Sequence, residues 1–156
     1  MGEDRGAAPA RAADLRSAKY PAPGRRAPRN GNCHHHVMGH GHAVQEELRE
    51  PARALRHAIP DVYDGYRQMH AAAYAAGVLD QKTKELIALA IAVSKECDGC
   101  IASHARGAVR TGATESEVAE ALGVAIAMNG GPGTVYGPRA FAAFREFAEE
   151  ADPQQG

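Results

Sequence analysis

The sequence has few aromatic residues, with five Tyr, three Phe and no Trp among 156 residues. Its hydrophobic fraction is an ordinary 44%, and alanine supplies much of it. Because Ala is the best helix former and a poor strand residue, such a core suits closely packed helices better than a sheet. No strand pattern or internal repeat competes with this interpretation, so the predicted fold class is all-α, with about six helices.

Long apolar runs are also missing. No run reaches the roughly 18 residues needed to cross a membrane, and residues 1–33 lack the apolar stretch of a secretory signal. These absences predict a soluble cytoplasmic protein. The cytosol keeps thiols reduced, and three cysteines leave one unpaired, so a disulfide scaffold is not expected. Redox catalysis or metal binding is the expected use of the thiols.

Excess positive charge is missing from the part of the chain that is patterned for folding. Residues 1–36 carry seven basic and three acidic residues, whereas the remainder carries 11 basic and 16 acidic ones. A nucleic-acid-binding domain needs the opposite sign on its folded part. We therefore predict no nucleic-acid partner.

The N-terminal segment has almost no large apolar side chains. Residues 1–42 are rich in Pro, Gly, Ala and Arg and are predicted to be disordered, because they cannot bury enough surface to offset chain entropy. Residues 43–156 are predicted to form the helical domain, and Met38 is a candidate translation start. The tract "CHHHVMGHGH" contains Cys33 and five histidines (His34, His35, His36, His40 and His42). It suits either a metal site or, more simply, a flexible tail that binds metal opportunistically.

From Val44 onward, apolar residues recur at helical spacing, with clear start and stop signals. Asp80 is an N-cap candidate, Thr114 to Glu117 read as a capping box, and Pro51 is expected to kink or restart its helix. Phe141, Phe144 and Phe147 form an apolar stripe typical of a core or a subunit interface. The expected helices cover about residues 44–59, 61–76, 81–96, 99–111 and 115–129, with a last helix after a break at 130–133.

The stretch "ECDGCIASH" places Cys97, Cys100 and His104 on one face at the start of a helix. A helix N-terminus favours thiolate and can lower a cysteine pKa from about 8.5 by one or more units. The three-residue offset allows a disulfide within one turn. Because His104 follows Cys100 at i+4, the spacing favours Cys100 as the nucleophile and Cys97 as the resolving cysteine.

Two other interpretations of this motif stay open. Structural zinc needs four ligands, and C-x2-C-x3-H supplies three with no second pair downstream. A passive pair of core cysteines beside a core histidine is the other alternative. Redox catalysis is favoured over both because the three side chains share one face, and no metal or cofactor is predicted.

Residues 45–148 resemble the carboxymuconolactone decarboxylase-like superfamily, in particular its alkylhydroperoxidase (AhpD-like) branch. The signature is a glutamate, eleven residues, then C-x2-C-x3-H, which falls here on Glu85, Cys97, Cys100 and His104. The resemblance implies an all-α homo-oligomer that reduces hydroperoxides or disulfides. Cys100 would be the peroxidatic and Cys97 the resolving cysteine, with His104 and Glu85 as a proton relay. Electrons would come from a lipoylated or thioredoxin-like dithiol protein.

Spacing alone does not support the role of Glu85, because twelve residues of straight helix cover about 18 Å. Without the resemblance, Glu85 is interpreted as an exposed first-turn glutamate.

The sequence also departs from the peroxidase branch, which has a histidine where Gly99 stands in "CDGC". Asp98 adds a negative charge that opposes thiolate formation. The competing functions are therefore of three kinds. The protein could be a thiol oxidoreductase, with either modest peroxidase activity or general thiol–disulfide exchange. It could instead be a lactone decarboxylase or a non-catalytic metal-binding protein.

Overall fold

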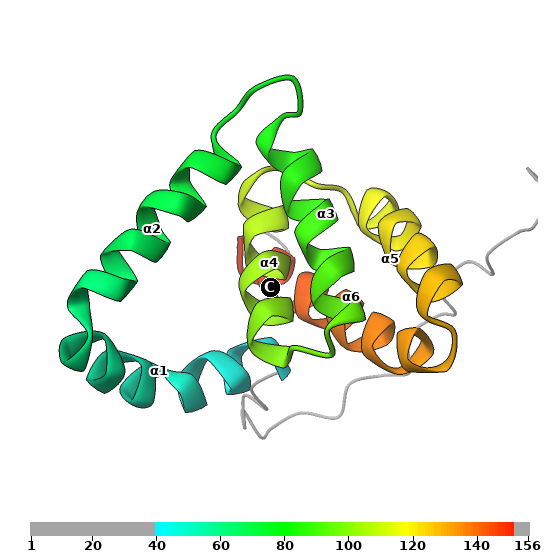
Figure 1. Cartoon of the computed structure of the whole chain (residues 1–156). Helices are drawn as coiled ribbons and strands as arrows, with labels where there is room; N and C mark the ends of the chain where they lie inside the picture. Colours follow the sequence, from blue (N-terminus) through cyan, green and yellow to red (C-terminus); the bar gives the residue numbers. More distant parts are fainter. Residues whose placement is uncertain (1–39, 152–156) are drawn as a thin grey trace, which may run out of the picture. The chain divides into compact units, whose positions relative to one another are not determined.

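Six α-helices follow one another along residues 40–151, the part of the chain that the computed structural model describes (Figure 1). No strand occurs in this part, so the predicted all-α fold is confirmed. None of the described helices is both long and apolar enough to cross a membrane. The helices are α1 (His40–Ala58), α2 (Pro60–Tyr74), α3 (Gln81–Ser94), α4 (Asp98–Arg110), α5 (Glu115–Asn129) and α6 (Gly131–Ala151).

Two predicted helix starts are confirmed by their capping hydrogen bonds. The Asp80 carboxylate accepts the backbone N–H of Thr83 at 2.7 Å and so caps α3. At α5 the Thr114 hydroxyl accepts the N–H of Glu117, whose carboxylate accepts the N–H of Thr114 in return. Each cap satisfies backbone donors that the first helical turn leaves unpaired. The core helices therefore begin where local chemistry indicates.

Other boundaries differ from the sequence-based expectation. Helix α1 already begins at His40, inside the segment predicted to be disordered, because the Glu146 carboxylate accepts the N–H groups of Gly41 and His42 at 3.0 and 3.3 Å. It also continues through Pro51. The predicted break at 130–133 is confined to Gly130, whose φ of +62° makes the turn alone. The prediction of disorder for residues 1–39, with Cys33 and His34 to His36, lies outside the described residues.

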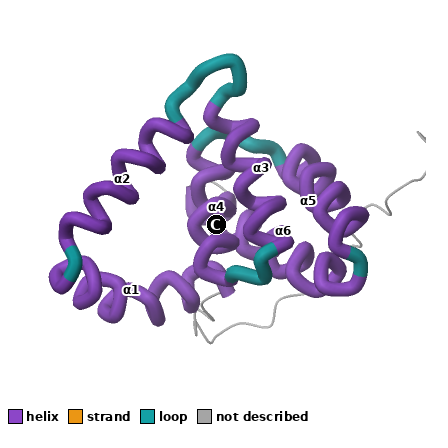
Figure 2. The backbone as a smooth tube through the Cα atoms, in the orientation of Figure 1, coloured by secondary structure: helices purple, strands orange, loops and turns teal. Residues whose placement is uncertain are grey.

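The hydrophobic core lies among α3, α4, α5 and α6, which pack side by side (Figures 1 and 2). Its largest fully buried side chains are Leu89 and Val93 of α3, Ile101 of α4 and Val118 of α5. From α6, Phe144 and Phe147 are 3% exposed. The remaining buried positions are mostly alanine, which lets the helix backbones approach closely: Ala92, Ala105, Ala108, Ala125, Ala140 and Ala143. This packed group holds the motif-bearing helix α4 rigidly in place.

The second half of α1 and the whole of α2, residues 48–74, form what we call the arm. Figure 1 shows the arm running away from the packed helices and returning to α3 through the loop 75–80. Helix α2 has no buried residue. Apolar residues that recur at helical spacing along the arm form an exposed stripe: Leu48, Leu55, Ile59, Val62, Tyr66 and Met69. Within the described part of the chain, the arm has no hydrophobic core of its own.

Candidate active site

The turn between α3 and α4 fixes the position of Cys97. Helix α3 ends with the N–H of Glu96 donating to the Val93 carbonyl and the N–H of Cys97 donating to the Ala92 carbonyl, both at 3.1 Å. This C-terminal motif requires a left-handed residue, and Glu96 takes that role with a φ of +54°. Cys97 then serves as the N-cap of α4. One cysteine therefore both closes α3 and opens α4.

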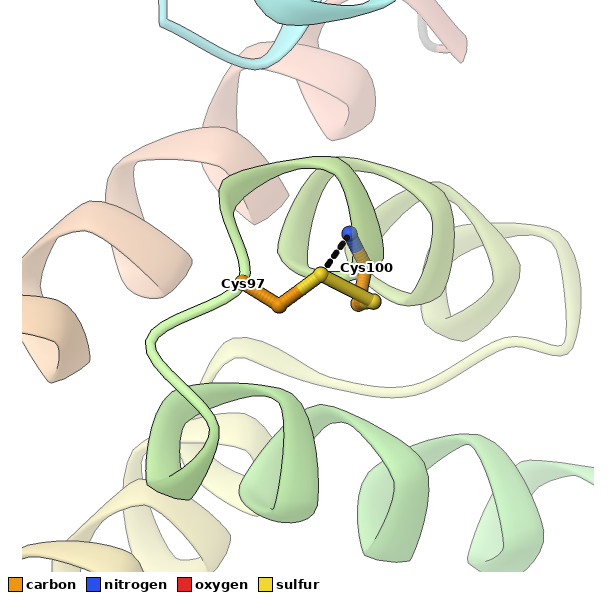
Figure 3. Close-up of a disulfide and its surroundings, with 2 residues drawn as sticks. All are labelled: Cys97 and Cys100. Atoms are coloured by element: carbon orange, nitrogen blue, oxygen red, sulfur yellow. Dashed lines mark hydrogen bonds between the residues drawn. A yellow bond between two sulfur atoms is a disulfide. The ribbon is translucent and has the colours of Figure 1, made fainter. Parts of the chain in front are cut away.

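Cys97 and Cys100 form a disulfide across the first turn of α4, with their Cα atoms 5.2 Å apart (Figure 3). The Cys97 sulfur also accepts the backbone N–H of Cys100 at 3.2 Å. Cys97 is half-buried, whereas Cys100 is exposed. The N–H group and the positive end of the helix dipole thus favour negative charge on the Cys97 sulfur, while Cys100 faces solvent.

Glu85 and His104 meet across the contact between α3 and α4. The Glu85 carboxylate lies 2.8 Å from His104 Nδ1, and the two side chains are only 15% and 17% exposed. Folding thus brings together two residues that helix spacing left far apart. If Nδ1 carries the proton that Glu85 accepts, Nε2 keeps a lone pair that can take a thiol proton.

The space for the Glu85 carboxylate depends on Gly107, which sequence reasoning missed. A Cβ atom at Gly107 would lie 2.5 Å from the Glu85 Cδ and Oε2 atoms, closer than real contacts allow. The signal in the sequence was a glycine inside a helical pattern, which indicates either lost helix stability or a close approach. Here Gly107 permits a close approach between α4 and Glu85.

His104 follows Cys100 by one helical turn, but no hydrogen bond joins it to either sulfur within residues 40–151. The shared face keeps the imidazole near the thiols, and Glu85 fixes its orientation. In the disulfide state the site therefore consists of two adjoining pairs: the bridged cysteines at the start of α4 and the His104–Glu85 pair behind them.

Asp98 stands beside Cys97, and its carboxylate is shared between two basic groups. His40 Nε2 lies 3.0 Å from one oxygen, and Arg139 donates to the other at 3.4 Å. These contacts connect α1 and α6 to the first turn of α4. The charge that the sequence suggested would oppose thiolate formation is thus partly offset by Arg139, and by His40 when protonated.

Gly99 lies between the cysteines, under the arm residue Leu48. A Cβ atom at Gly99 would lie 3.0 Å from Leu48 Cδ1. A histidine at this position, as in the peroxidase branch described above, would therefore require Leu48 to move. Leu48 is itself 45% exposed, so it forms an apolar edge beside the disulfide.

Candidate metal ligands do not gather in the described residues 40–151, where no three His, Cys, Asp or Glu side chains are arranged to hold a metal ion. Two histidines of the N-terminal tract fall in this range. His40 pairs with Asp98, and His42 Nε2 lies within 4 Å of the carboxylates of Glu146 and Glu150. Both therefore hold the start of α1 in place.

Known proteins resemble this chain in both sequence and fold. Residues 60–149 match the carboxymuconolactone decarboxylase family. The chain belongs to that family. An uncharacterized protein of Cupriavidus necator is 40% identical over 98 residues, which is 63% of this chain and 87% of the relative. An uncharacterized protein from the cox locus of Paracoccus denitrificans is 37% identical over 83 residues, or 53% of this chain and 75% of the relative.

A solved structure from the carboxymuconolactone decarboxylase family also resembles this one. The apo crystal structure of a family member from Legionella pneumophila has a TM-score of 0.67 and 39% sequence identity, and the match covers 69% of this chain and 96% of that chain. The predicted superfamily is thus confirmed.

Proposed function

We propose that this protein is a thiol-dependent oxidoreductase that reduces hydroperoxides or disulfides with Cys97 and Cys100. The observation that carries the proposal is the cysteine pair bridged within one turn of α4, on the helix that also holds His104 against Glu85. A 5.2 Å Cα separation is ordinary for a disulfide, so the bond can open and close with little backbone movement.

In the oxidative half-reaction, His104 takes the Cys100 proton and the Cys100 thiolate attacks the outer oxygen of a hydroperoxide. The O–O bond breaks, Cys100 becomes a sulfenic acid, and the alkoxide takes the proton from His104. The Cys97 thiolate then attacks the sulfur of Cys100. The disulfide forms, and the departing hydroxide is protonated to water. Glu85 keeps the imidazole oriented and stabilises its charged form.

In the reductive half-reaction, a donor thiolate attacks the exposed Cys100 sulfur and Cys97 leaves as a thiolate. Cys97 is the better leaving group because the Cys100 N–H and the helix dipole stabilise its charge. The second thiol of the donor then releases Cys100 and carries away the disulfide. This regiochemistry suits a dithiol donor, either a lipoylated or a thioredoxin-like protein, in the reducing cytoplasm.

The proposal includes a homo-oligomer. The exposed apolar stripe of the arm, which includes Leu55, Val62 and Met69, has no cover in the described part of the chain. Contiguous exposed apolar surface commonly marks a protein–protein interface. A second copy of the chain that covers the arm would remove these side chains from water.

The test uses full-length reduced protein that carries Cys33→Ser, so that two thiols remain. One equivalent of tert-butyl hydroperoxide is expected to consume both thiols within seconds, and mass spectrometry should identify a Cys97–Cys100 bridge. Cys100→Ser should reduce peroxide consumption to the uncatalysed rate. Cys97→Ser should consume one equivalent and leave a sulfenic acid that dimedone traps.

The matched control is Cys33→Ser alone, which should keep the full rate because Cys33 lies outside the proposed pair. Repeated turnover by the Cys100→Ser variant would exclude the proposed nucleophile. The lactone decarboxylase alternative needs acid–base groups but no cysteine pair. Decarboxylation that survives in the double Cys97→Ser/Cys100→Ser variant would support that lyase instead.

A further inference from the structure

The last residue of α2, Tyr74, reaches the His104–Glu85 pair from the arm. Its ring lies nearly parallel to the His104 ring, with centroids 5.7 Å apart and an interplanar angle of 7°. Its hydroxyl oxygen lies 3.5 Å from His104 Nδ1, the nitrogen that also faces Glu85. Tyr74 is half-buried in a helix without a single buried residue. Tyr74 therefore links the end of the arm to the His104–Glu85 pair.

A second aromatic ring extends this contact. The ring of His70, one turn earlier in α2, stacks on Tyr74 at 4.2 Å with an angle of 9°. His70, Tyr74 and His104 thus form three nearly parallel rings, with 6.4 Å between the two imidazoles. Offset-stacked rings at these separations attract one another. The stack resists rotation of the His104 imidazole.

The end of α2 is held in place by the neighbour of Glu85 in sequence. Lys84 Nζ donates hydrogen bonds to the carbonyls of Ala73 and Ala75, at 2.8 and 2.6 Å. A cation at a helix C-terminus satisfies unpaired carbonyls and favours the helix dipole. Because Lys84 and Glu85 are adjacent on α3, the same helix turn anchors Tyr74 and supplies the carboxylate.

The ring of Tyr74 matters more than its hydroxyl in this arrangement. The Nδ1 proton has one good acceptor, Glu85 at 2.8 Å, and the hydroxyl at 3.5 Å is at the outer limit of a hydrogen bond. Burial, followed by the charge of Glu85, raises the pKa of Tyr74, so the hydroxyl stays neutral beside the carboxylate. Tyr74 thus contributes an uncharged aromatic wall.

We infer that Tyr74 is a positioning residue of the redox site, whose ring holds the His104 imidazole in the orientation that meets Glu85. The inference rests on the proposed thiol chemistry. It also gives α2 a role, because the proton relay works only while the end of the arm is docked. Among residues 40–151, Glu85 of α3 and Tyr74 of α2 lie within hydrogen-bond distance of His104, and the His70 ring of α2 lies further along the stack. Cys100 lies one turn away on its own helix.

The test measures Cys100 directly, without peroxide. In full-length protein with Cys33→Ser and Cys97→Ser, the rate of Cys100 alkylation by iodoacetamide is followed from pH 5 to 9, alongside hydroperoxide kinetics in the Cys33→Ser background. Tyr74→Leu should shift the pH profile of alkylation and reduce kcat/KM by roughly ten- to a hundredfold, since misplaced catalytic groups lose that much. Tyr74→Phe, which keeps the ring, should stay within about threefold of the parent.

The matched control is Tyr63→Leu, because Tyr63 is also a half-buried tyrosine of α2 but faces Arg56, and it should leave both readouts unchanged. Lys84→Met, which frees the end of α2, should shift the alkylation profile in the same direction as Tyr74→Leu. An alkylation profile of Tyr74→Leu identical to that of the parent, or equal losses for Tyr74→Leu and Tyr74→Phe, would overturn the inference. If the parent protein consumes no peroxide but the alkylation profiles differ as expected, the proposed function fails while the positioning role stands.

Discussion

The four packed helices and the arm differ in how much of their apolar surface they bury. Both have amphipathic sequences, but α3 to α6 bury their apolar faces against one another, with Leu89, Ile101 and Val118 at 0% exposure. In the arm, comparable side chains stay in contact with water, with Val62 at 65% and Met69 at 62% exposure. Because hydrophobic stabilisation follows the apolar area removed from water, the packed helices supply most of the fold's stability.

Ion pairs show the same contrast. In the arm, the pairs Arg53–Glu50 and Arg67–Asp64 join residues three positions apart on one helix. Around the core, Lys82–Glu117 joins α3 to α5, and Asp98 joins α4 to α6. Local exposed pairs contribute little to stability, whereas pairs between helices restrain tertiary structure. The ion pairs of the arm therefore do little to fix its position, whereas those around the core tie one helix to another.

The largest expected effect contrasts the same substitution in the two regions. Leu89→Ala removes a fully buried side chain and should lower the free energy of unfolding by about 2–5 kcal/mol. Leu55→Ala, where the side chain is 51% exposed, should change it by about 0.5 kcal/mol or less in the monomer. Urea unfolding of both variants at low protein concentration measures the difference.

Sedimentation velocity at rising protein concentration tests whether the exposed stripe of the arm takes part in self-association. If a second copy covers the arm, Leu55→Ala should weaken self-association while Leu89→Ala acts on the fold itself. Equal losses of unfolding free energy for the two variants under monomeric conditions would contradict the distinction between core and arm.

The second effect concerns Gly107, where the close packing of α4 against α3 leaves room for the Glu85 carboxylate. Gly107→Ala places a methyl group where the Glu85 carboxylate lies, and should reduce hydroperoxide kcat/KM by about tenfold or more by displacing Glu85 from His104. Gly123→Ala is the matched control, since nothing lies within 4 Å of its Cβ position in α5. That change should stabilise the protein by up to about 1 kcal/mol and leave the kinetics unaltered.

Unchanged kinetics in Gly107→Ala would show that Glu85 does not need its position beside His104. A melting temperature measured for each variant separates this result from unfolding. Stopped-flow traces of peroxide consumption then report on folded protein alone.

Local chemistry made much of the fold predictable from sequence. Asp80 and the Thr114–Glu117 capping box define helix starts through hydrogen bonds within four residues, so sequence alone reveals them. Cys97, Cys100 and His104 are likewise related by spacing on one helix. Glu85 is not, because its meeting with His104 depends on how α3 packs against α4. Only resemblance to a family singled it out.

Helical periodicity shows which face of a helix is apolar and says nothing of what covers that face. The stripe through Leu55 and Met69 is apolar by periodicity, but the described part of the chain does not cover it. Close approaches are equally hidden: Leu48 over Gly99 and Glu85 beside Gly107 follow from how one helix packs against another. A glycine in a helix signals such an approach without naming the neighbour.

The smallest expected effect uses pH to separate the two kinds of ion pair. Hydrogen bonds from Lys82 and from Thr114 lower the pKa of Glu117 from 4.5 to about 2. A carboxyl whose pKa is lower in the folded state stabilises the protein above its unfolded pKa, and this contribution is lost as the pH falls through the folded value. The stability difference between wild type and Glu117→Gln should therefore be complete at pH 7, begin to shrink near pH 4.5 and vanish near pH 2.

Asp64→Asn, which breaks the local pair with Arg67 in the arm, should leave the urea midpoint nearly unchanged at pH 7. A midpoint at pH 7 that falls as far in Asp64→Asn as in Glu117→Gln would show that the arm's local pairs matter as much as the bridge between α3 and α5.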